Sequence, residues 1–163
     1  MAAPLETCLA LLEDVTPLRG DCGRLCGAAC CRSLEGEETG MLLFPGEAPR
    51  YAGRPGWRVI PCAAGELLIC PGRCSRDERP LACRLFPVLP VPRGDAVRVR
   101  FDLRAAAVCP LTREGLRALD PAFVEAVRAC GRVLLGDPEL SAALERLLLA
   151  QEDLAALRRE MGG

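Results

Sequence analysis

The sequence predicts an α+β fold, a small cysteine-rich core of loops and short antiparallel strands clasped by N- and C-terminal helices. Three observations predict it. Short apolar runs bounded by Gly, Pro or Asp occupy the middle of the chain, leucines recur at helical spacing near both ends, and most of the 11 cysteines lie in two groups. At 163 residues, half of them apolar, the chain is expected to form a single domain over residues 1–163.

The first helix is expected from Leu5 to Val15, where apolar residues recur every three or four positions. Pro17 then ends the pattern. Cys8 lies on the apolar stripe of this helix, so we expect its thiol to belong to the core rather than to a functional site.

The middle of the chain predicts short strands, each bounded by Gly, Pro or Asp. The last of them, AVRVRF, alternates apolar and polar residues as a half-buried strand does. The predicted strands are residues 41–44, 57–60, 66–69, 84–89 and 96–101.

After residue 110 the chain reads as helical, beginning with a short turn over residues 112–119. Asp120 and Asp137 each precede a proline, the signature of an N-cap followed by proline at the first helical position. Gly136 is expected to end the first of these two helices. Cys130 lies on the apolar face of that helix, so we expect it, like Cys8, to be a core residue.

Composition excludes several classes of function. The 21 basic and 22 acidic residues nearly cancel, so charge gives no reason to expect nucleic acid or an anionic membrane as a partner. The chain contains no His and no Lys, which excludes Ser-His-Asp and Cys-His catalysis, HExxH zinc hydrolysis and Schiff-base chemistry. The N-terminus does not read as a secretion signal, and no apolar run reaches bilayer length, so we expect a cytoplasmic protein.

The cysteines are expected to hold metal. In a reducing compartment, clustered thiols are metal ligands or redox groups more often than disulfides. Thiolates brought together repel one another unless a cation, an iron-sulfur core or oxidation joins them. The candidate ligands are Cys22, Cys26, Cys30, Cys31, Cys70, Cys74, Cys83 and Cys109, enough for two four-coordinate ions or one larger cluster.

Two motifs in these groups resemble the YkgJ-like, or CxxCxxCC, cysteine-cluster family. CGRLCGAACC is followed by CSRDERPLACRLFP, which matches that family's Cys-Cys pair, its Cys before Arg-Pro, and its Cys-Arg-x-Phe-Pro. The resemblance covers roughly residues 22–110 and leaves 111–163 as a helical C-terminal extension. It implies a zinc- or iron-chelating domain. The family's further cysteine corresponds to Cys70 or Cys62, and we favour Cys70.

Three functions are consistent with this interpretation. The first is chelation of zinc or iron for a structural, storage or delivery role. The second is an iron-sulfur redox protein, or an accessory to an enzyme such as a methyl transferase, since flagellin lysine methylases carry a similar module. The third is a thiol redox sensor that uses Cys30 and Cys31. Enzymatic activity does not follow from the shared cysteines, so the prediction leans towards a non-enzyme, and the sequence names no protein partner.

The arginines around the second group suggest a countercharge for metal-bound thiolates. We expect Arg84, beside Cys83, to play this part. Arg79 and the proline after it are expected to form the turn that orients the Cys83 side chain. For Arg73 and Arg76 the sequence leaves a solvated surface position and a countercharge equally open.

Overall fold

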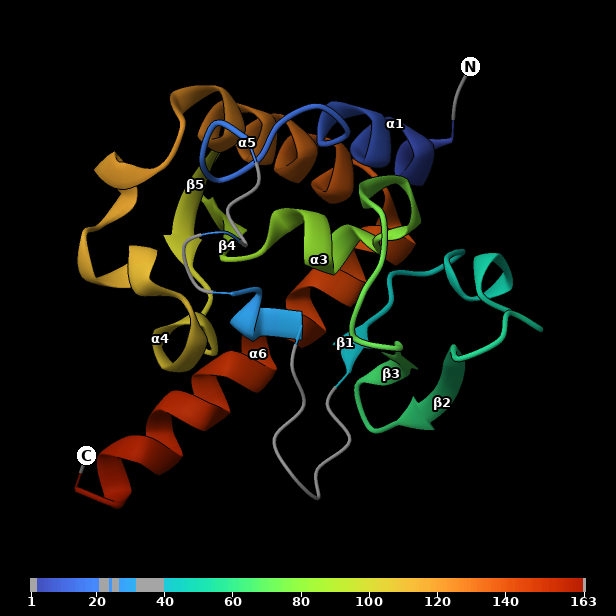
Figure 1. The fold of residues 1–163 in the computed structure, drawn as a ribbon. Helices are drawn as coiled ribbons and strands as arrows, with labels where there is room; N and C mark the ends of the chain where they lie inside the picture. The colour runs from blue at the N-terminus through green and yellow to red at the C-terminus, as the bar shows by residue number, and fades with distance from the viewer. Residues whose placement is uncertain (1–2, 21–23, 25–26, 32–39, 163) are drawn as a thin grey trace.

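The computed structural model describes residues 3–20, 24, 27–31 and 40–162, which form helices and two small antiparallel sheets (Figure 1). The predicted α+β class is therefore confirmed. Helix α1 (Pro4–Leu11) lies along α5 (Pro121–Leu135), and these two helices contact each other extensively. Helix α1 ends at Leu11, earlier than predicted, although Leu12 is still fully buried.

The second sheet is a hairpin of β4 (Val88–Arg93) and β5 (Ala96–Phe101), in which Val88 pairs with Phe101. Both strands pack on α5. The approach is close at Gly131, where a Cβ atom would lie 2.6 Å from Cβ of Pro90 and 2.7 Å from Cγ1 of Val97. The hairpin and α5 thus meet at a position that has room only for glycine.

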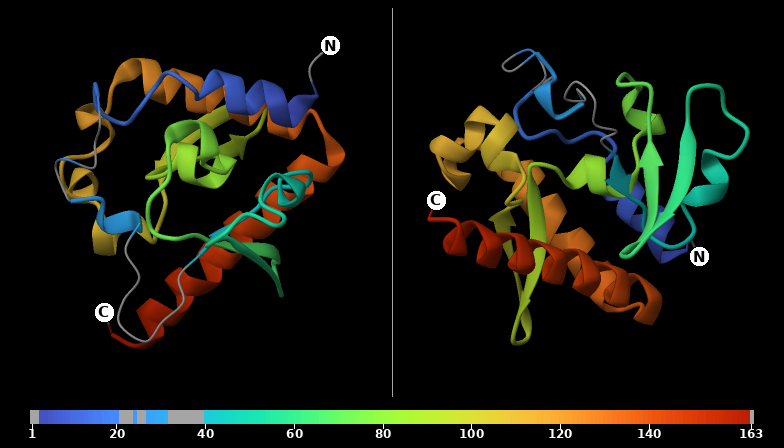
Figure 2. Two further views of the ribbon diagram at one scale, coloured as in Figure 1. Left: turned by 45° about the vertical axis from the view of Figure 1, so that its right-hand side comes forward. Right: turned by 90° about the horizontal axis from the view of Figure 1, so that it is seen from below.

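The first sheet has three strands in the order β1-β3-β2. They are β1 (Met41–Leu42), β2 (Arg58–Cys62) and β3 (Gly65–Ile69), all paired antiparallel. This sheet has a small apolar cluster of its own around Tyr51 and Leu68, and the short 3-10 turn η2 (Ala48–Arg50) packs there. Figure 2 shows the sheet to one side of the helices.

One predicted strand is wrong. Residues 84–89 were expected to be extended, but Leu81–Leu85 form the short helix α3, and strand β4 begins only at Val88. A buried apolar run of this length has the same pattern in a short helix and in a buried strand. Pro87 stops the helix, since the residue before a proline avoids the helical conformation; Phe86 there has ψ 134°.

The remaining short elements connect the larger ones. They are η1 (Ala29–Cys31), η3 (Arg76–Glu78), α4 (Ala105–Val108), η4 (Pro110–Arg113) and η5 (Leu116–Ala118). The turn predicted over residues 112–119 is thus present as two short 3-10 turns.

The C-terminal helices begin as predicted. Asp120 caps α5 by accepting a hydrogen bond from the N–H of Ala122, and Asp137 caps α6 (Pro138–Glu160) by accepting from two N–H groups. Gly136 ends α5. Buried Gln151 attaches α6 to the chain after β5 by accepting a hydrogen bond from the N–H of Leu103.

The main core lies between α1, α3, the β4–β5 hairpin, α5 and the first half of α6. Cys8 and Cys130 are both fully buried in it, and the Cys8 thiol lies 3.7 Å from the carbonyl oxygen of Cys130. The expectation that these two cysteines are core residues is confirmed.

Among the described residues, every helix is either too short or too polar to cross a lipid bilayer.

We predict that Gly131→Ala lowers the free energy of unfolding by about 1–3 kcal/mol, because the new methyl group would overlap a rigid proline ring. Urea denaturation measures the change. At a helix position without a close neighbour, Gly→Ala would stabilise the protein by up to about 1 kcal/mol through helix propensity. Ala129→Gly on the same helix measures this propensity difference and serves as the control. A Gly131→Ala variant as stable as the wild type would show that the contact between α5 and the hairpin is loose.

Candidate metal centre

Five of the predicted ligands surround one cavity of about 90 Å³. They come from three separate parts of the chain: η1, the loop after β3, and α3. The cysteines that line it are Cys30, Cys31, Cys70, Cys74 and Cys83. The opposite wall is apolar and includes Met41, Trp57 and Phe86. The tertiary structure therefore gathers the two cysteine groups that the sequence separates by some forty residues.

Cys30 and Cys31 lie on η1, with their sulfur atoms 3.9 Å apart. The N–H of Cys31 donates to the carbonyl oxygen of Ala28, which closes this turn. Gly72 has a φ of +86°, and a Cβ atom on it would lie 3.4 Å from the carbonyl oxygen of Cys31. A residue free to adopt a left-handed conformation thus brings the loop that carries Cys70 and Cys74 against η1.

Cys70 and Cys62 lie at opposite ends of strand β3. Cys70 directly follows β3 and lines the cavity. Cys62 pairs with Gly65 at the turn end of the β2–β3 hairpin and is exposed. From Gly65 to Cys70 the chain makes five steps, and at about 3.3 Å per residue these span about 17 Å. Cys62 thus lies far from the thiols that line the cavity.

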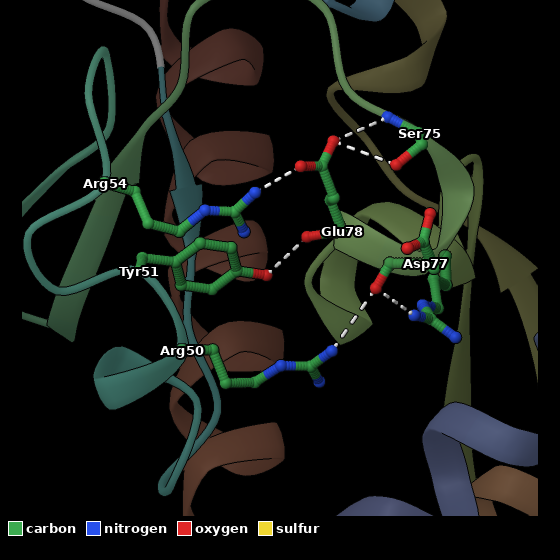
Figure 3. Close-up of polar contacts among 7 residues, drawn as sticks. Arg50, Tyr51, Arg54, Ser75, Asp77 and Glu78 are labelled. Carbon is green, nitrogen blue, oxygen red and sulfur yellow. Dashed lines mark hydrogen bonds and ion pairs between the residues drawn. The ribbon is translucent and has the colours of Figure 1, made fainter.

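Cys74 is followed by a capping box. The carboxylate of Glu78 accepts hydrogen bonds from the N–H and the hydroxyl of Ser75, both at 2.9 Å, as η3 begins (Figure 3). This reciprocal cap fixes the backbone directly after Cys74.

Three side chains from the segment around η2 hold η3 in place (Figure 3). The guanidinium of Arg54 forms an ion pair with Glu78, and the hydroxyl of Tyr51 donates to the carbonyl oxygen of Glu78 at 2.8 Å. Arg50 donates to the carbonyl oxygen of Asp77 at 3.3 Å. The loop between Cys74 and Cys83 is therefore anchored to the segment between β1 and β2 by two hydrogen bonds to its backbone and one ion pair to its Glu78 side chain.

A buried carboxylate holds the start of α3, which carries Cys83. Glu47 is fully buried and accepts hydrogen bonds from the N–H of Leu81 at 2.7 Å and from the N–H of Phe44 at 2.8 Å. Burial raises the pKa of Glu47, and these two backbone hydrogen bonds oppose the rise. The sequence pattern did not single out Glu47, because an acidic residue in a Gly- and Pro-rich segment is typical of a solvated loop.

Arg84 is not the countercharge that the sequence suggested. It is buried, and its guanidinium donates to three backbone carbonyl oxygens: those of Leu9, Asp77 and Arg79, at 2.9, 2.9 and 3.0 Å. Burial lowers its pKa, and no thiol is among the groups that shift it. Arg84 ties α3 to α1 and to η3.

The guanidinium of Arg76 also donates hydrogen bonds to backbone carbonyl oxygens. They are those of Leu12, Glu13 and Val15, just beyond the end of α1. Cations are favoured at helix C-termini, where carbonyl groups lack intrahelical partners. Arg76 is half-buried and also lines a cavity beside Cys30, so both possibilities left open for it by the sequence stay open.

The cation at the thiols is Arg79, which lines the cavity. Burial lowers its pKa, but a hydrogen bond to Cys74 and the charges of Cys74, Cys31 and Cys83 outweigh burial and raise the pKa overall. Its Nε–H is buried and has no acceptor among the described residues. Arg79 therefore brings both a positive charge and an unused donor to this wall.

Four thiols form an electrostatic cluster around Arg79. Burial raises the pKa of Cys83, and negative charge on Cys74, Cys31 and Cys70 raises it further. Burial also raises the pKa of Cys74, while the hydrogen bond from Arg79 opposes the rise. Losing four protons together is unfavourable at such a site unless a cation enters, because each thiolate raises the cost of the next.

A smaller cavity of about 50 Å³ adjoins the larger one. Cys30, Arg79, Cys83 and Phe86 line both, and Cys109 lines only the smaller. Six of the predicted ligands thus lie on the walls of two neighbouring cavities. Cys22 and Cys26 lie outside the described residues.

The thiols line these cavities, but they do not converge on one point as ligands of a bound metal ion would. No three acidic or Cys side chains among the described residues are placed so that they could hold a metal ion as they stand. Coordination would require the side chains of these cysteines to rearrange.

Comparisons with protein-family profiles, with curated proteins and with solved structures found no match.

We predict that the free energy of unfolding falls as pH rises through the raised pKa of Glu47. The folded protein binds this proton more tightly than the unfolded chain, so the stabilisation present at low pH is lost above the folded pKa. Glu47→Gln should remove this part of the pH dependence, whereas Glu66→Gln, at an exposed strand position, should retain it. Denaturant titrations from acid to neutral pH measure the difference, and identical slopes in all three proteins would contradict the prediction.

Proposed function

We propose that this protein is a zinc- or iron-chelating cysteine-cluster protein whose principal ligands are Cys31, Cys70, Cys74 and Cys83. The single observation that carries the proposal is that these four cysteines, from distant segments, line one cavity beside Arg79. Buried structural cysteines usually lie singly among apolar side chains, as Cys8 does. Four thiols and a cation around one space favour a metal centre instead.

The donor set suits zinc or iron. Four thiolates match the tetrahedral preference of structural zinc and also the ligand set of an iron-sulfur cluster. Arg79 would offset the negative charge that four thiolates leave on a divalent ion.

The resemblance to the YkgJ-like family supports the same function. Clustered cysteines fit a reducing compartment, and we extend the proposal to a cytoplasmic location. Cys22, Cys26, Cys30 and Cys109 remain candidate ligands. Bound metal would link η1, the loop after β3 and α3.

One experiment distinguishes the three alternative functions. Zinc is colourless and does not change oxidation state, whereas an iron-sulfur centre is coloured and bleaches on reduction. A thiol redox sensor would bind neither metal and would show a Cys30–Cys31 link after mild oxidation. The absorption spectrum of anaerobically purified protein, with elemental analysis, separates the three.

We predict that wild-type protein prepared without oxygen contains zinc or iron, and that Cys74→Ser lowers the metal content by at least half. Removing a thiolate from the cluster leaves the remaining ligands too few for a four-coordinate site. Cys62→Ser and Cys130→Ser are the matched controls, because one thiol is exposed far from the cavity and the other is core. Metal-free wild-type protein with every thiol reduced would contradict the proposal.

We also predict that a chelator under reducing conditions exposes the amides of residues 40–80 to rapid hydrogen exchange, while α5 and α6 keep part of their protection. The first sheet has only a small apolar cluster, whereas the two C-terminal helices contribute to the main core. Structural zinc contributes on the order of 10 kcal/mol in small domains. Equal exchange with and without metal throughout the chain would show that the metal does not support the fold.

A further inference from the structure

The smaller cavity is lined by two thiols that are not among the four principal ligands. Cys30, Cys83 and Cys109 line it, together with two arginines, Arg76 and Arg79. Helix α4 contacts η1, so the residue that ends α4, Cys109, lies near the turn that carries Cys30. No carboxylate is among the described residues that line this cavity, so its donors are sulfur atoms only.

Local contacts keep Cys109 in this position. Its N–H donates to the carbonyl oxygen of Ala105 at 2.7 Å, and its own carbonyl oxygen accepts from the hydroxyl of Thr112 at 2.9 Å. Pro110 begins the next turn, η4, and also lines the cavity. The backbone on both sides of Cys109 is therefore fixed, and only its side chain needs to turn.

We infer that the smaller cavity is a second metal position, in which Cys30 and Cys109 bind a thiophilic divalent ion and Cys83 bridges to the ion held by the principal ligands. This inference rests on the proposed function. It adds a second ion, a shared ligand and a difference in coordination between the two positions.

Sharing Cys83 follows from where the thiols lie. Two thiols, Cys30 and Cys83, line both cavities, and Cys31, Cys70 and Cys74 line only the larger one. Of these two, Cys30 is exposed and Cys83 is the more buried, so Cys83 is assigned as the shared ligand. A thiolate has lone pairs enough to bridge two ions, and a bridge brings one fewer negative charge into a buried site than two separate sets would. Arg79, which also lines both cavities, lies where it can offset the remaining excess charge.

The two positions differ in the number of ligands. The principal set has four thiolates and leaves no coordination site open, as structural sites do. Among the described residues the second set has three thiolates, so its fourth position is open to water, to a donor from another molecule, or to one of the candidate ligands Cys22 and Cys26. Because one of these three thiolates is shared, the second ion is held less tightly than the first, and we assign the second position to metal delivery and the first to the fold.

Cobalt(II) titration of the reduced, metal-free 163-residue chain, with no sulfide added, tests this inference. We expect two equivalents of cobalt per chain, the second bound at least tenfold more weakly than the first. The first should give the visible spectrum of four-thiolate tetrahedral cobalt and a high-spin electron paramagnetic resonance signal. The second should reduce that signal, because a shared thiolate couples the two ions magnetically.

Cys109→Ser should bind one equivalent only and retain the spectrum of the first ion, while Cys62→Ser should bind two as the wild type does. If Cys109→Ser does not fold, a small-molecule chelator should remove one ion from wild-type protein at least tenfold faster than the other. One equivalent in the wild type, two in Cys109→Ser, or a resonance signal that doubles would overturn the second position or its bridge. No cobalt binding at all would instead contradict the proposed function.

Discussion

The carboxylate of Glu47 is the contact on which the position of Cys83 depends. It is buried at the junction of the first sheet and α3, where it accepts one hydrogen bond from each side. Without it, the N–H groups of Phe44 and Leu81 would be left unsatisfied, at a cost of about 1–3 kcal/mol each. Because α3 has only five residues, it cannot be stable alone and takes its orientation from this contact and from Arg84.

Arginine has two different roles around the cavities. Arg76 and Arg84 donate to backbone carbonyl oxygens and join α1, η3 and α3 into one unit. The forked guanidinium suits this role because one side chain reaches several acceptors. Arg79 differs in that it lines both cavities, the charges of nearby thiols raise its pKa, and its Nε–H has no acceptor among the described residues. A buried donor without an acceptor is costly in a fold, and a negatively charged centre beside it would offset that cost.

Regular local patterns were predictable. Asp120 and Asp137 act as caps as expected, and Cys8 and Cys130 are buried as their helical stripes indicated. Capping depends on hydrogen bonds within a few residues, and amphipathic periodicity on one helix, so both can be read from the chain alone. The strand predicted over residues 84–89 failed because its apolar run is short enough to suit either a helix or a strand.

The α+β class, the C-terminal helices and the two groups of clustered cysteines could be read from the chain alone. Which cysteines share a cavity, that Cys62 lies apart from it, and that Arg79 rather than Arg84 lines it depend on the tertiary structure. The roles of Glu47 and the arginines arise from contacts between residues far apart in the chain. Such contacts leave no periodic or motif signal, because burial of a charge depends on which distant segment packs over it.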